Sequence, residues 1–206
     1  MTELLVATTH SGKFAEVQAF LSKLPLRITS LKSLANPPEV IEDGKTFEEN
    51  ALKKARMLAE YSGLLTLADD SGLEVDALSG RPGIYSARYA GEEGNDERNN
   101  QKLLGELIGV GEEQRTARFV CALALCAPQS QGMKDWVVRQ TCEGRIAFEP
   151  SGSHGFGYDP LFFYPPFGKT FGEIEREVKA TVSHRGKALM KLAEVLPTLM
   201  EVPTKP

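Results

Sequence analysis

The chain contains 206 residues, of which 41% are hydrophobic and 25% are charged, and its formal net charge is -4. A chain of this length can bury one sizeable core or two closely joined lobes. The net negative charge disfavours a nucleic-acid backbone as the main partner, because such binding usually depends on a basic face. A small polyanion held in a locally basic cleft is compatible with this composition.

No apolar run approaches the roughly 20 residues that a membrane-spanning helix needs, and no basic segment precedes an apolar stretch at the N-terminus. We therefore expect a cytoplasmic protein without a membrane partner. The cysteines Cys121, Cys126 and Cys142 are odd in number and lack the paired spacing of metal ligands. We expect them to be reduced residues of a core or a strand.

The first predicted element is a short apolar strand at about Leu4–Thr8, followed by a turn rich in hydroxyl groups and then by helical spacing of apolar residues. Gly12 lets the backbone approach a ligand closely, and Lys13 adds a positive charge at the start of the helix. Such a turn is typical of a phosphate-binding site. It is not a Walker A loop, because Ala7 replaces the first glycine and Phe14 replaces the magnesium-binding Ser or Thr.

The next part of the chain contains a strand, an acidic loop and a second helix. The first helix is expected to end near Leu24, and Leu26–Thr29 has the pattern of a strand. Residues 36–38, Asn-Pro-Pro, break the chain before the acidic loop at residues 39–44. Thr46 and Glu49 have the spacing of a capping box, so a helix should begin there and end near residues 62–63.

The segment after this helix is the most informative one in the chain. A predicted strand at Leu64–Ala68 is followed by Asp69, Asp70, Ser71 and Gly72, a sequence that is typical of a turn. Adjacent carboxylates repel each other, so this position is costly unless a divalent cation or a nearby base offsets the charge. The segment therefore indicates a metal-binding or catalytic corner. The alternative is a purely structural turn held by Asx-type hydrogen bonds.

The second half of the chain adds one helix and two longer strands. Residues 95–108 have helical spacing, and Arg118–Ala127 and Trp136–Phe148 have the pattern of strands joined by a polar turn, which predicts a hairpin. Strand–helix alternation followed by a hairpin predicts an α/β fold with a mixed sheet and flanking helices. We find no repeats or low-complexity linkers, and we expect residues 1–206 to form a single domain.

Two later segments contain groups suited to nucleotide binding. Residues 155–163 combine two glycines, aromatic rings and a carboxylate in a turn before a strand; a ring can stack on a nucleobase, although a plain glycine turn with core aromatics fits equally well. Ser183 has the character of an N-cap residue for the last helix, which places His184 and Arg185 in its first turn. Cations at a helix N-terminus oppose the macrodipole, so they favour a bound anion there.

Together these segments resemble the inosine triphosphate pyrophosphatase family, whose members hydrolyse non-standard purine nucleoside triphosphates to the monophosphate and pyrophosphate. The resemblance covers nearly the whole chain and rests on residues 7–16, 46–51, 68–73, 82–89, 155–160 and 183–186. One departure is visible in the first motif, where the family usually has Thr-Gly-Asn and this chain has Thr8, Thr9 and His10. The imidazole is bulkier than an Asn side chain and titrates near neutral pH.

The resemblance implies roles for individual residues. Asp70 would be the general base and a ligand of Mg²⁺, and Glu42 would be the second metal carboxylate. Glu39 and Asp43 are close enough in the sequence to take the place of Glu42, and a solvated acidic turn is the alternative for that loop. Asp69 would support the metal and substrate beside Asp70. The residues expected to bind the substrate are Thr8, Thr9, His10, Ser11, Gly12, Lys13, Ser71, Phe156, Gly157, Tyr158, Asp159, Lys179, His184 and Arg185.

The resemblance also implies an elongated architecture of two lobes with the active cleft between them, a homodimer, and purine nucleoside triphosphates such as ITP, dITP and XTP as substrates. Two other functional classes remain open from the residues alone. A regulatory module could bind purine nucleotides without cleaving them, although a pure binder has no need of a base beside its metal. A metal-dependent nuclease could use the same carboxylates, but the acidic balance and the lack of a basic stripe weigh against nucleic acid as a partner.

Overall fold

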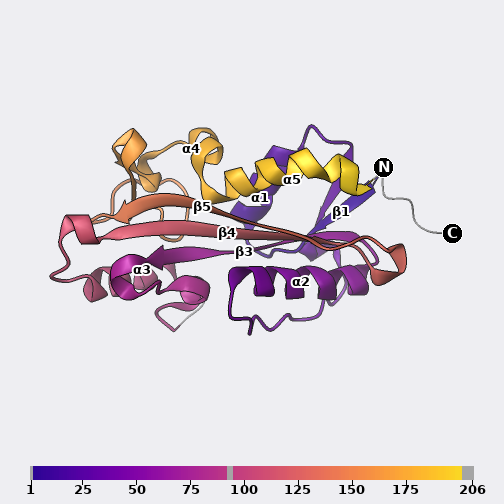
Figure 1. Cartoon of the computed structure of the whole chain (residues 1–206), viewed down its shortest axis with the longest axis horizontal. Helices are drawn as coiled ribbons and strands as arrows, with labels where there is room; N and C mark the ends of the chain where they lie inside the picture. The colour runs from indigo at the N-terminus through magenta and orange to yellow at the C-terminus, as the bar shows by residue number, and fades with distance from the viewer. Residues whose placement is uncertain (1, 92–94, 201–206) are drawn as a thin grey trace. The chain divides into compact units, whose positions relative to one another are not determined.

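The computed structural model describes residues 2–91 and 95–200, and it has the mixed α/β fold that the sequence predicts (Figure 1). Within these residues a seven-stranded sheet has the order β2-β1-β3-β4-β5-β6-β7. β1 is parallel to β2 and β3, whereas β6 is antiparallel to β5 and β7. The strands are β1 (Thr2–Val6), β2 (Leu26–Ser30), β3 (Leu65–Val75), β4 (Thr116–Cys126), β5 (Trp136–Ile146), β6 (Phe162–Tyr164) and β7 (Lys169–Thr170).

The described chain also contains five α-helices and divides into two compact units. The helices are α1 (Ser11–Leu21), α2 (Phe47–Ser62), α3 (Asp96–Glu106), α4 (Arg176–Val182) and α5 (His184–Met200). Of the described residues, 2–70, 121–140 and 186–200 form unit one, and 71–91, 95–120 and 141–185 form unit two. No helix in the described ranges is both long and apolar enough to cross a bilayer.

The core of unit one forms because alternate strand residues point to opposite faces of the sheet. On one face, apolar side chains of β1, β3 and β4 pack against α1 and α5. The buried members of this cluster include Leu4, Val6, Val17, Leu21, Leu65, Leu67, Cys121, Leu123, Leu125, Ala188, Leu189, Leu192 and Leu196. Figure 1 shows α5 and α2 on opposite sides of the strands, so the intervening strand residues face α2.

Helix α2 begins and ends where the sequence predicts. Thr46 is the N-cap, and its Oγ1 accepts a hydrogen bond from the Glu49 N–H at 3.1 Å. The reciprocal half of the predicted capping box is absent, because Glu49 Oε2 accepts from the Lys45 N–H instead, at 2.6 Å. The helix stops at Gly63, whose φ of 72° is a left-handed conformation that suits glycine.

The prediction that a strand ends before Asp69 is wrong. β3 continues without a turn through Asp69, Asp70, Ser71 and Gly72 to Val75. The local turn signal is overridden because both carboxylates are surrounded by groups from distant parts of the chain, as described below. Since successive strand residues alternate, Asp69 and Asp70 point to opposite faces of the sheet.

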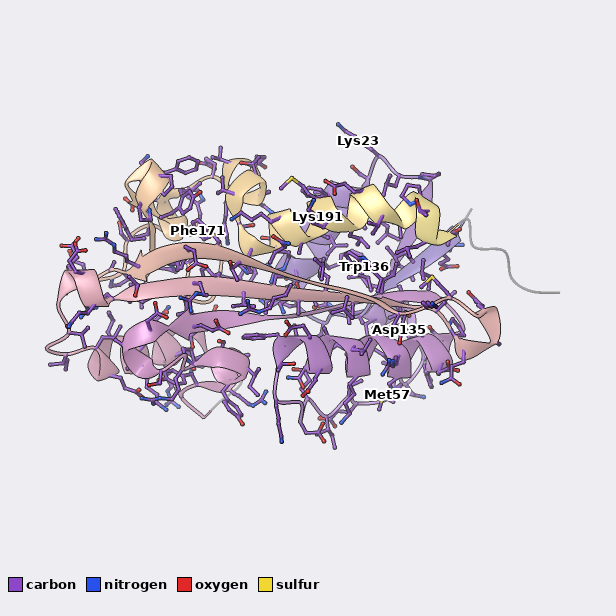
Figure 2. The ribbon with its side chains drawn as sticks, in the orientation of Figure 1. Lys23, Met57, Asp135, Trp136, Phe171 and Lys191 are labelled. Carbon is purple, nitrogen blue, oxygen red and sulfur yellow. The ribbon has the colours of Figure 1, made fainter. Side chains whose placement is uncertain are left out.

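Unit two has its own core, built on aromatic side chains. Phe119 of β4 lies 4.5 Å from Phe162 and stacks on Phe171 at 5.9 Å, measured between ring centroids. Phe171, labelled in Figure 2, is fully buried. Leu73 of β3 and Leu103 of α3 pack in the same cluster. This core therefore holds together α3, the strands and the segment that carries the second group of predicted site residues.

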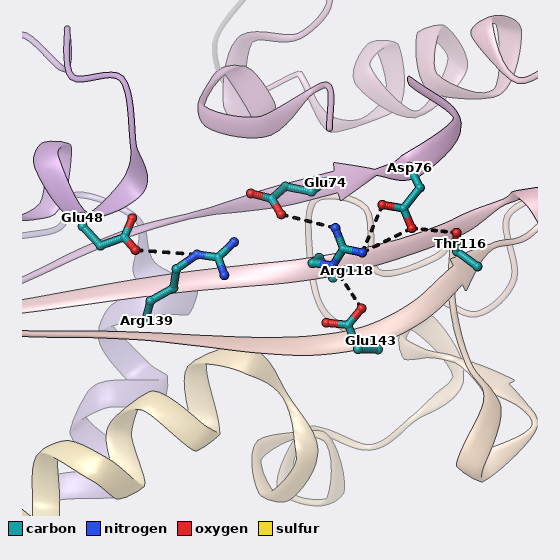
Figure 3. A network of polar contacts seen from close by, with 7 residues as sticks. All are labelled: Glu48, Glu74, Asp76, Thr116, Arg118, Arg139 and Glu143. Carbon is teal, nitrogen blue, oxygen red and sulfur yellow. Dashed lines mark hydrogen bonds and ion pairs between the residues drawn. The ribbon is translucent and has the colours of Figure 1, made fainter. Parts of the chain in front are cut away.

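A polar network lies across β3, β4 and β5 in unit two (Figure 3). Arg118 is its centre: its Nη2 lies 3.0 Å from Asp76, its Nε lies 3.0 Å from Glu143, and its Nη1 lies 3.6 Å from Glu74. Thr116 donates to the Asp76 carboxylate at 2.7 Å. Because these side chains are partly exposed, each ion pair contributes about 1 kcal/mol or less.

The remaining predicted elements agree with the structure to within a few residues. The helix predicted at 95–108 is α3, and the two predicted strands are β4 and β5, which lie next to each other in the sheet as a hairpin requires. α1 ends at Leu21, earlier than predicted. α5 begins at His184, directly after Ser183, whose extended backbone (ψ 159°) fits the predicted N-cap position.

Candidate functional site

The amino-terminal turn of unit one is held by its own side chains. Thr8 Oγ1 accepts a hydrogen bond from the His10 N–H at 3.1 Å, and His10 Nδ1 accepts one from the Lys13 N–H at 3.3 Å. His10 is therefore the N-cap of α1, with an extended backbone. The imidazole thus supplies the acceptor that an N-cap requires. Thr9 and Ser11 are exposed in the same turn.

The Lys13 side chain points to Asp69. Its Nζ lies 2.6 Å from Asp69 Oδ1, and Cys121 Sγ donates to Asp69 Oδ2 at 3.2 Å. Asp69 is only 6% exposed, whereas the Lys13 side chain is 20% exposed. The family resemblance implies that Asp69 supports the metal and the substrate. In the structure its contacts hold the ammonium group at the phosphate-binding turn, and the Cys121 donor could not be inferred from the sequence.

Asp70 lies in a different environment on the other face of β3. It is 7% exposed, and among the described residues its buried Oδ2 has no hydrogen-bond partner. Burial and, after it, the negative charge of Glu42 raise its pKa, which is about 6 once the opposing effects of Lys13, Lys54 and Asn50 are included. A carboxyl group with this pKa can exchange a proton near neutral pH, which is characteristic of catalytic sites.

The structure distinguishes the three acidic residues of the loop that precedes α2. Glu42 is the one whose charge acts on Asp70, and its side chain, 25% exposed, forms an ion pair with Lys54. Asp43 is 67% exposed and pairs with Lys53 at 2.5 Å, which lowers the pKa of its carboxyl group. Glu39 is exposed. Because Glu42 is the carboxylate of this loop that raises the pKa of Asp70, we favour Glu42 over Glu39 and Asp43 as the second metal carboxylate.

The Asp70 site fits a small divalent cation. A buried carboxylate oxygen without a donor and a second carboxylate that repels it both gain from a bound cation. The described residues contain no group of three or more His, Cys, Asp or Glu side chains that could hold a metal. Magnesium, however, is commonly bound by one or two carboxylates together with substrate phosphates and water, so the two carboxylates are sufficient.

Lys54 and Asn50 were not identified as site residues from the sequence. Asn50 is 1% exposed, and its Oδ1 accepts from the Gly44 N–H at 2.8 Å, which ties the acidic loop to α2. Its buried Nδ2 has no partner within the described residues. The two residues are four positions apart, on the helix face that carries Ala51 and Ala55. Polar side chains on an otherwise apolar helix face were the signal that could have identified them.

In unit two, Asp159 organises the loop at residues 155–159. Its Oδ2 accepts hydrogen bonds from the Phe156 N–H at 2.8 Å and from Lys179 Nζ at 2.5 Å. Gly155 has a φ of 79°, and a Cβ there would lie 1.9 Å from Asp159 Oδ2. Only glycine fits this position. Asp159 was expected to bind the substrate, and the oxygen described here already bonds two groups of the protein.

The other predicted residues of unit two surround Phe156 and the core below it. Lys179 Nζ lies 5.2 Å and Arg185 Cζ 5.6 Å from the centre of the half-buried Phe156 ring, within cation–π range. The His184 ring stacks on Phe119 at 4.7 Å. Tyr158 is a core residue whose hydroxyl donates to the Ser86 carbonyl at 2.8 Å, and burial raises its pKa.

The predicted residues thus form two groups, each within one unit. The turn at residues 8–13, Glu42 and Asp70 belong to unit one; Ser71, the loop at 155–159, Lys179, His184 and Arg185 belong to unit two. The first group combines cations with carboxylates and suits a metal and phosphates. The second combines an aromatic ring with buried donors and suits a nucleobase.

Residues 4–195 match the model of the Ham1 family. The dITP/XTP pyrophosphatase of Geobacter sulfurreducens is 54% identical to this chain over 196 residues, which cover 95% of this chain and 97% of that protein. A protein of the same name from Geobacillus kaustophilus is 51% identical over 194 residues, which cover 94% of each chain.

Solved structures agree with this relationship. A HAM1 protein from Coxiella burnetii matches with a TM-score of 0.88 at 39% identity, covering 96% of this chain and 100% of that chain. A nucleoside-triphosphatase / dITP/XTP pyrophosphatase from Mycobacterium abscessus matches with a TM-score of 0.76 at 42% identity, covering 93% of this chain and 98% of that chain. The sequence and the fold lead to the same conclusion: this chain belongs to the Ham1 family.

Proposed function

We propose that this chain hydrolyses non-standard purine nucleoside triphosphates, namely dITP, XTP and ITP, to the nucleoside monophosphate and pyrophosphate. The observation that carries the proposal is the buried Asp70 carboxyl, whose pKa is raised to about 6. Relatives that share about half of their residues with nearly the whole chain are named dITP/XTP pyrophosphatases. A non-hydrolytic regulatory module is disfavoured, because a binding protein gains nothing from a buried base beside a metal site.

The reaction requires that water attack the α-phosphorus of a polyanion. Mg²⁺, when bound by Asp70 and Glu42, supplies charge neutralisation at the phosphate oxygens. Asp70 accepts the proton of the attacking water, which requires that the water lie within hydrogen-bond reach of the carboxylate. The bond from the α-phosphorus to the bridging oxygen breaks, and pyrophosphate leaves.

The cations of unit one stabilise the charge that develops on the leaving group. Lys13 and the N-terminus of α1 bind the terminal phosphates, with the Thr8–Gly12 turn supplying backbone and hydroxyl donors. Asp69 keeps the Lys13 ammonium at this turn. Lys54 adds a second positive charge beside Glu42 and Asp70.

Base selection belongs to the second group. Phe156 provides a ring for stacking, and Lys179, His184 and Arg185 provide donors for the 6-oxo group of hypoxanthine or xanthine. The 6-amino group of adenine leaves such donors unpaired, which costs roughly 1–3 kcal/mol for each buried donor. Ser71, which follows Asp70 in β3, also contacts the substrate.

A homodimer, which the family resemblance implies, and a cytoplasmic location, which the composition favours, are part of the same proposal. Sedimentation of the purified protein tests the dimer directly: a single monomeric species at micromolar concentration would exclude it.

Product analysis tests the activity itself. The purified chain is incubated with Mg²⁺ and each of dITP, XTP, ITP, dATP and dGTP, and the products are separated. We expect monophosphate plus pyrophosphate from the first three. Diphosphate plus phosphate, or no turnover of any nucleotide, would refute the proposal.

A further inference from the structure

Gly157, at the centre of the loop predicted to bind the base, is held by one helix through both of its backbone polar groups. Its N–H donates to Asp96 Oδ2 at 2.7 Å, and its carbonyl accepts from Asn100 Nδ2 at 3.0 Å. Asp96 and Asn100 are one helical turn apart at the N-terminal end of α3, a helix near β3 in Figure 1. They lie about sixty residues from Gly157 in the sequence.

These contacts fix the peptide groups next to Phe156. The Phe156 N–H is already held by Asp159, so the hydrogen bonds to Gly157 fix the other side of the same residue. Gly157 has a φ of 63°, a left-handed conformation that glycine adopts readily, so these hydrogen bonds, and not steric restriction, select it from the conformations open to the residue. The position of the Phe156 ring therefore depends on α3 as well as on Asp159.

The hydrogen bond from Asn100 to the Gly157 carbonyl is present although burial of the Asn100 side chain is unfavourable. The Oδ1 atom of Asn100 is buried and has no hydrogen-bond partner in the described part of the chain. Burying an unpaired carbonyl is unfavourable, and an apolar residue at this position would avoid it. The bond from Nδ2 to Gly157 is the feature that an apolar residue could not supply.

We infer that Asp96 and Asn100 are positioning residues for base selection: they hold the Gly157 peptide so that the Phe156 ring stacks the purine with its 6-position toward Lys179 and Arg185, whose cationic groups lie 5.2 Å and 5.6 Å from the ring centre. This inference rests on the proposed function. It adds two specificity-determining residues of unit two, whereas the metal carboxylates and the phosphate-binding turn belong to unit one.

The test compares substrates that differ only in the base with an inhibitor that has no base. The variants are Asp96→Ala, Asn100→Ala and their combination, with Asp96→Asn as the conservative change, since an amide oxygen still accepts from the Gly157 N–H. Gln101→Ala is the matched control, because Gln101 is exposed on the same helix and bonds only Glu97 in the contacts described. For each protein, kcat/KM is measured for dITP and dATP, together with the inhibition constant of inorganic tripolyphosphate.

In the double variant we expect the ratio of kcat/KM for dITP over dATP to fall roughly three- to tenfold, the effect of losing two modest hydrogen bonds. Asp96→Asn and Gln101→Ala should keep the ratio of the wild type, and tripolyphosphate inhibition should stay the same in all variants.

An unchanged ratio of kcat/KM for dITP over dATP in the double variant overturns the inference. So does a parallel weakening of tripolyphosphate inhibition, which would indicate general damage to the fold. If wild-type protein does not hydrolyse dITP at all, the proposed function fails first, and the two failures are thus distinguishable.

Discussion

Asp69 and Asp70 are neighbours in the sequence with separate physical roles. Asp69 is paired with Lys13 and accepts from Cys121, so its negative charge is stabilised in the folded protein. The buried Oδ2 of Asp70 has no hydrogen-bond partner among the described residues, and Glu42 is a nearby like charge, so the negative charge of Asp70 is unfavourable there. A continuous strand is what separates the two environments, because it directs adjacent side chains to opposite faces.

The first prediction concerns Asp70→Asn. We expect kcat for dITP to fall by roughly a hundredfold or more, because the amide cannot accept a proton from water. The same change should stabilise the metal-free protein at pH 8. The carboxyl of Asp70 has a pKa of about 6 in the folded chain, compared with an ordinary value of 3.8 for an aspartate side chain. Stability therefore falls as the pH rises from 3.8 to 6, and the loss is complete above that window.

Removing this ionisable group should raise the free energy of unfolding at pH 8 by roughly 1–3 kcal/mol. Urea unfolding with EDTA, at pH 4 and pH 8, measures the difference. Asp43→Asn is the control, since that exposed carboxylate pairs with Lys53 and has a lowered pKa. A less stable Asp70→Asn variant at pH 8 would show that the Asp70 charge is compensated by its neighbours.

The second prediction concerns Lys13. Lys13→Ala should raise the KM for dITP, and it should also destabilise the protein, because it leaves the buried Asp69 carboxylate without its cation. The double variant Lys13→Ala with Asp69→Asn removes both charges. It should regain most of the lost stability, by roughly 1–3 kcal/mol, while KM stays high. Recovery of KM in the double variant would mean that Lys13 acts only through Asp69 and does not contact phosphate.

Among the elements, α2 and the loop before it show how far local sequence rules extend. The N-cap at Thr46 and the stop at Gly63 were predicted correctly, because both signals are set by residues within one turn of the helix end. β3 was predicted to end too early. Its turn-like sequence is overruled by Lys13 and Cys121, which lie more than fifty residues away and whose proximity no local pattern reveals. The contacts of α3 with Gly157 were missed for the same reason.

The third prediction concerns the acidic loop as an element. A Cβ at Gly44 would lie 2.6 Å from Asn50 Oδ1, so Gly44→Ala should displace the loop that carries Glu42. We expect the Mg²⁺ concentration for half-maximal activity to rise roughly three- to tenfold, since one metal carboxylate is misplaced. Gly105→Ala is the control: it is exposed in α3 with nothing within 4 Å of the added Cβ. An unchanged Mg²⁺ requirement in Gly44→Ala would remove Glu42 from the metal site.

At the scale of the whole molecule, the predicted site residues form two groups with different chemistry, one in each unit. The phosphate and metal groups belong to unit one, and the groups suited to a base belong to unit two. Most of the fold was predictable, because hydrophobic periodicity and helix caps define the elements. The family resemblance implied a site built from two parts of the chain. The charges that surround each site residue, in contrast, could be identified only from the structure.

The last prediction follows from that division. Lys13→Ala should lower kcat/KM for dITP and dATP by similar factors, because the triphosphate is common to both. Arg185→Ala should lower the value for dITP more than that for dATP, because a donor matched to the 6-oxo group favours only dITP. Since Arg185 is 2% exposed, this variant should also melt at a lower temperature, so the test depends on the ratio of kcat/KM for the two substrates and not on the melting temperature.

If Lys13 and Arg185 contact separate parts of the substrate, their effects on log kcat/KM add in the double variant. A substrate ratio that is unchanged by Arg185→Ala would limit Arg185 to bracing the start of α5, and a ratio changed by Lys13→Ala would show that the two groups do not act independently.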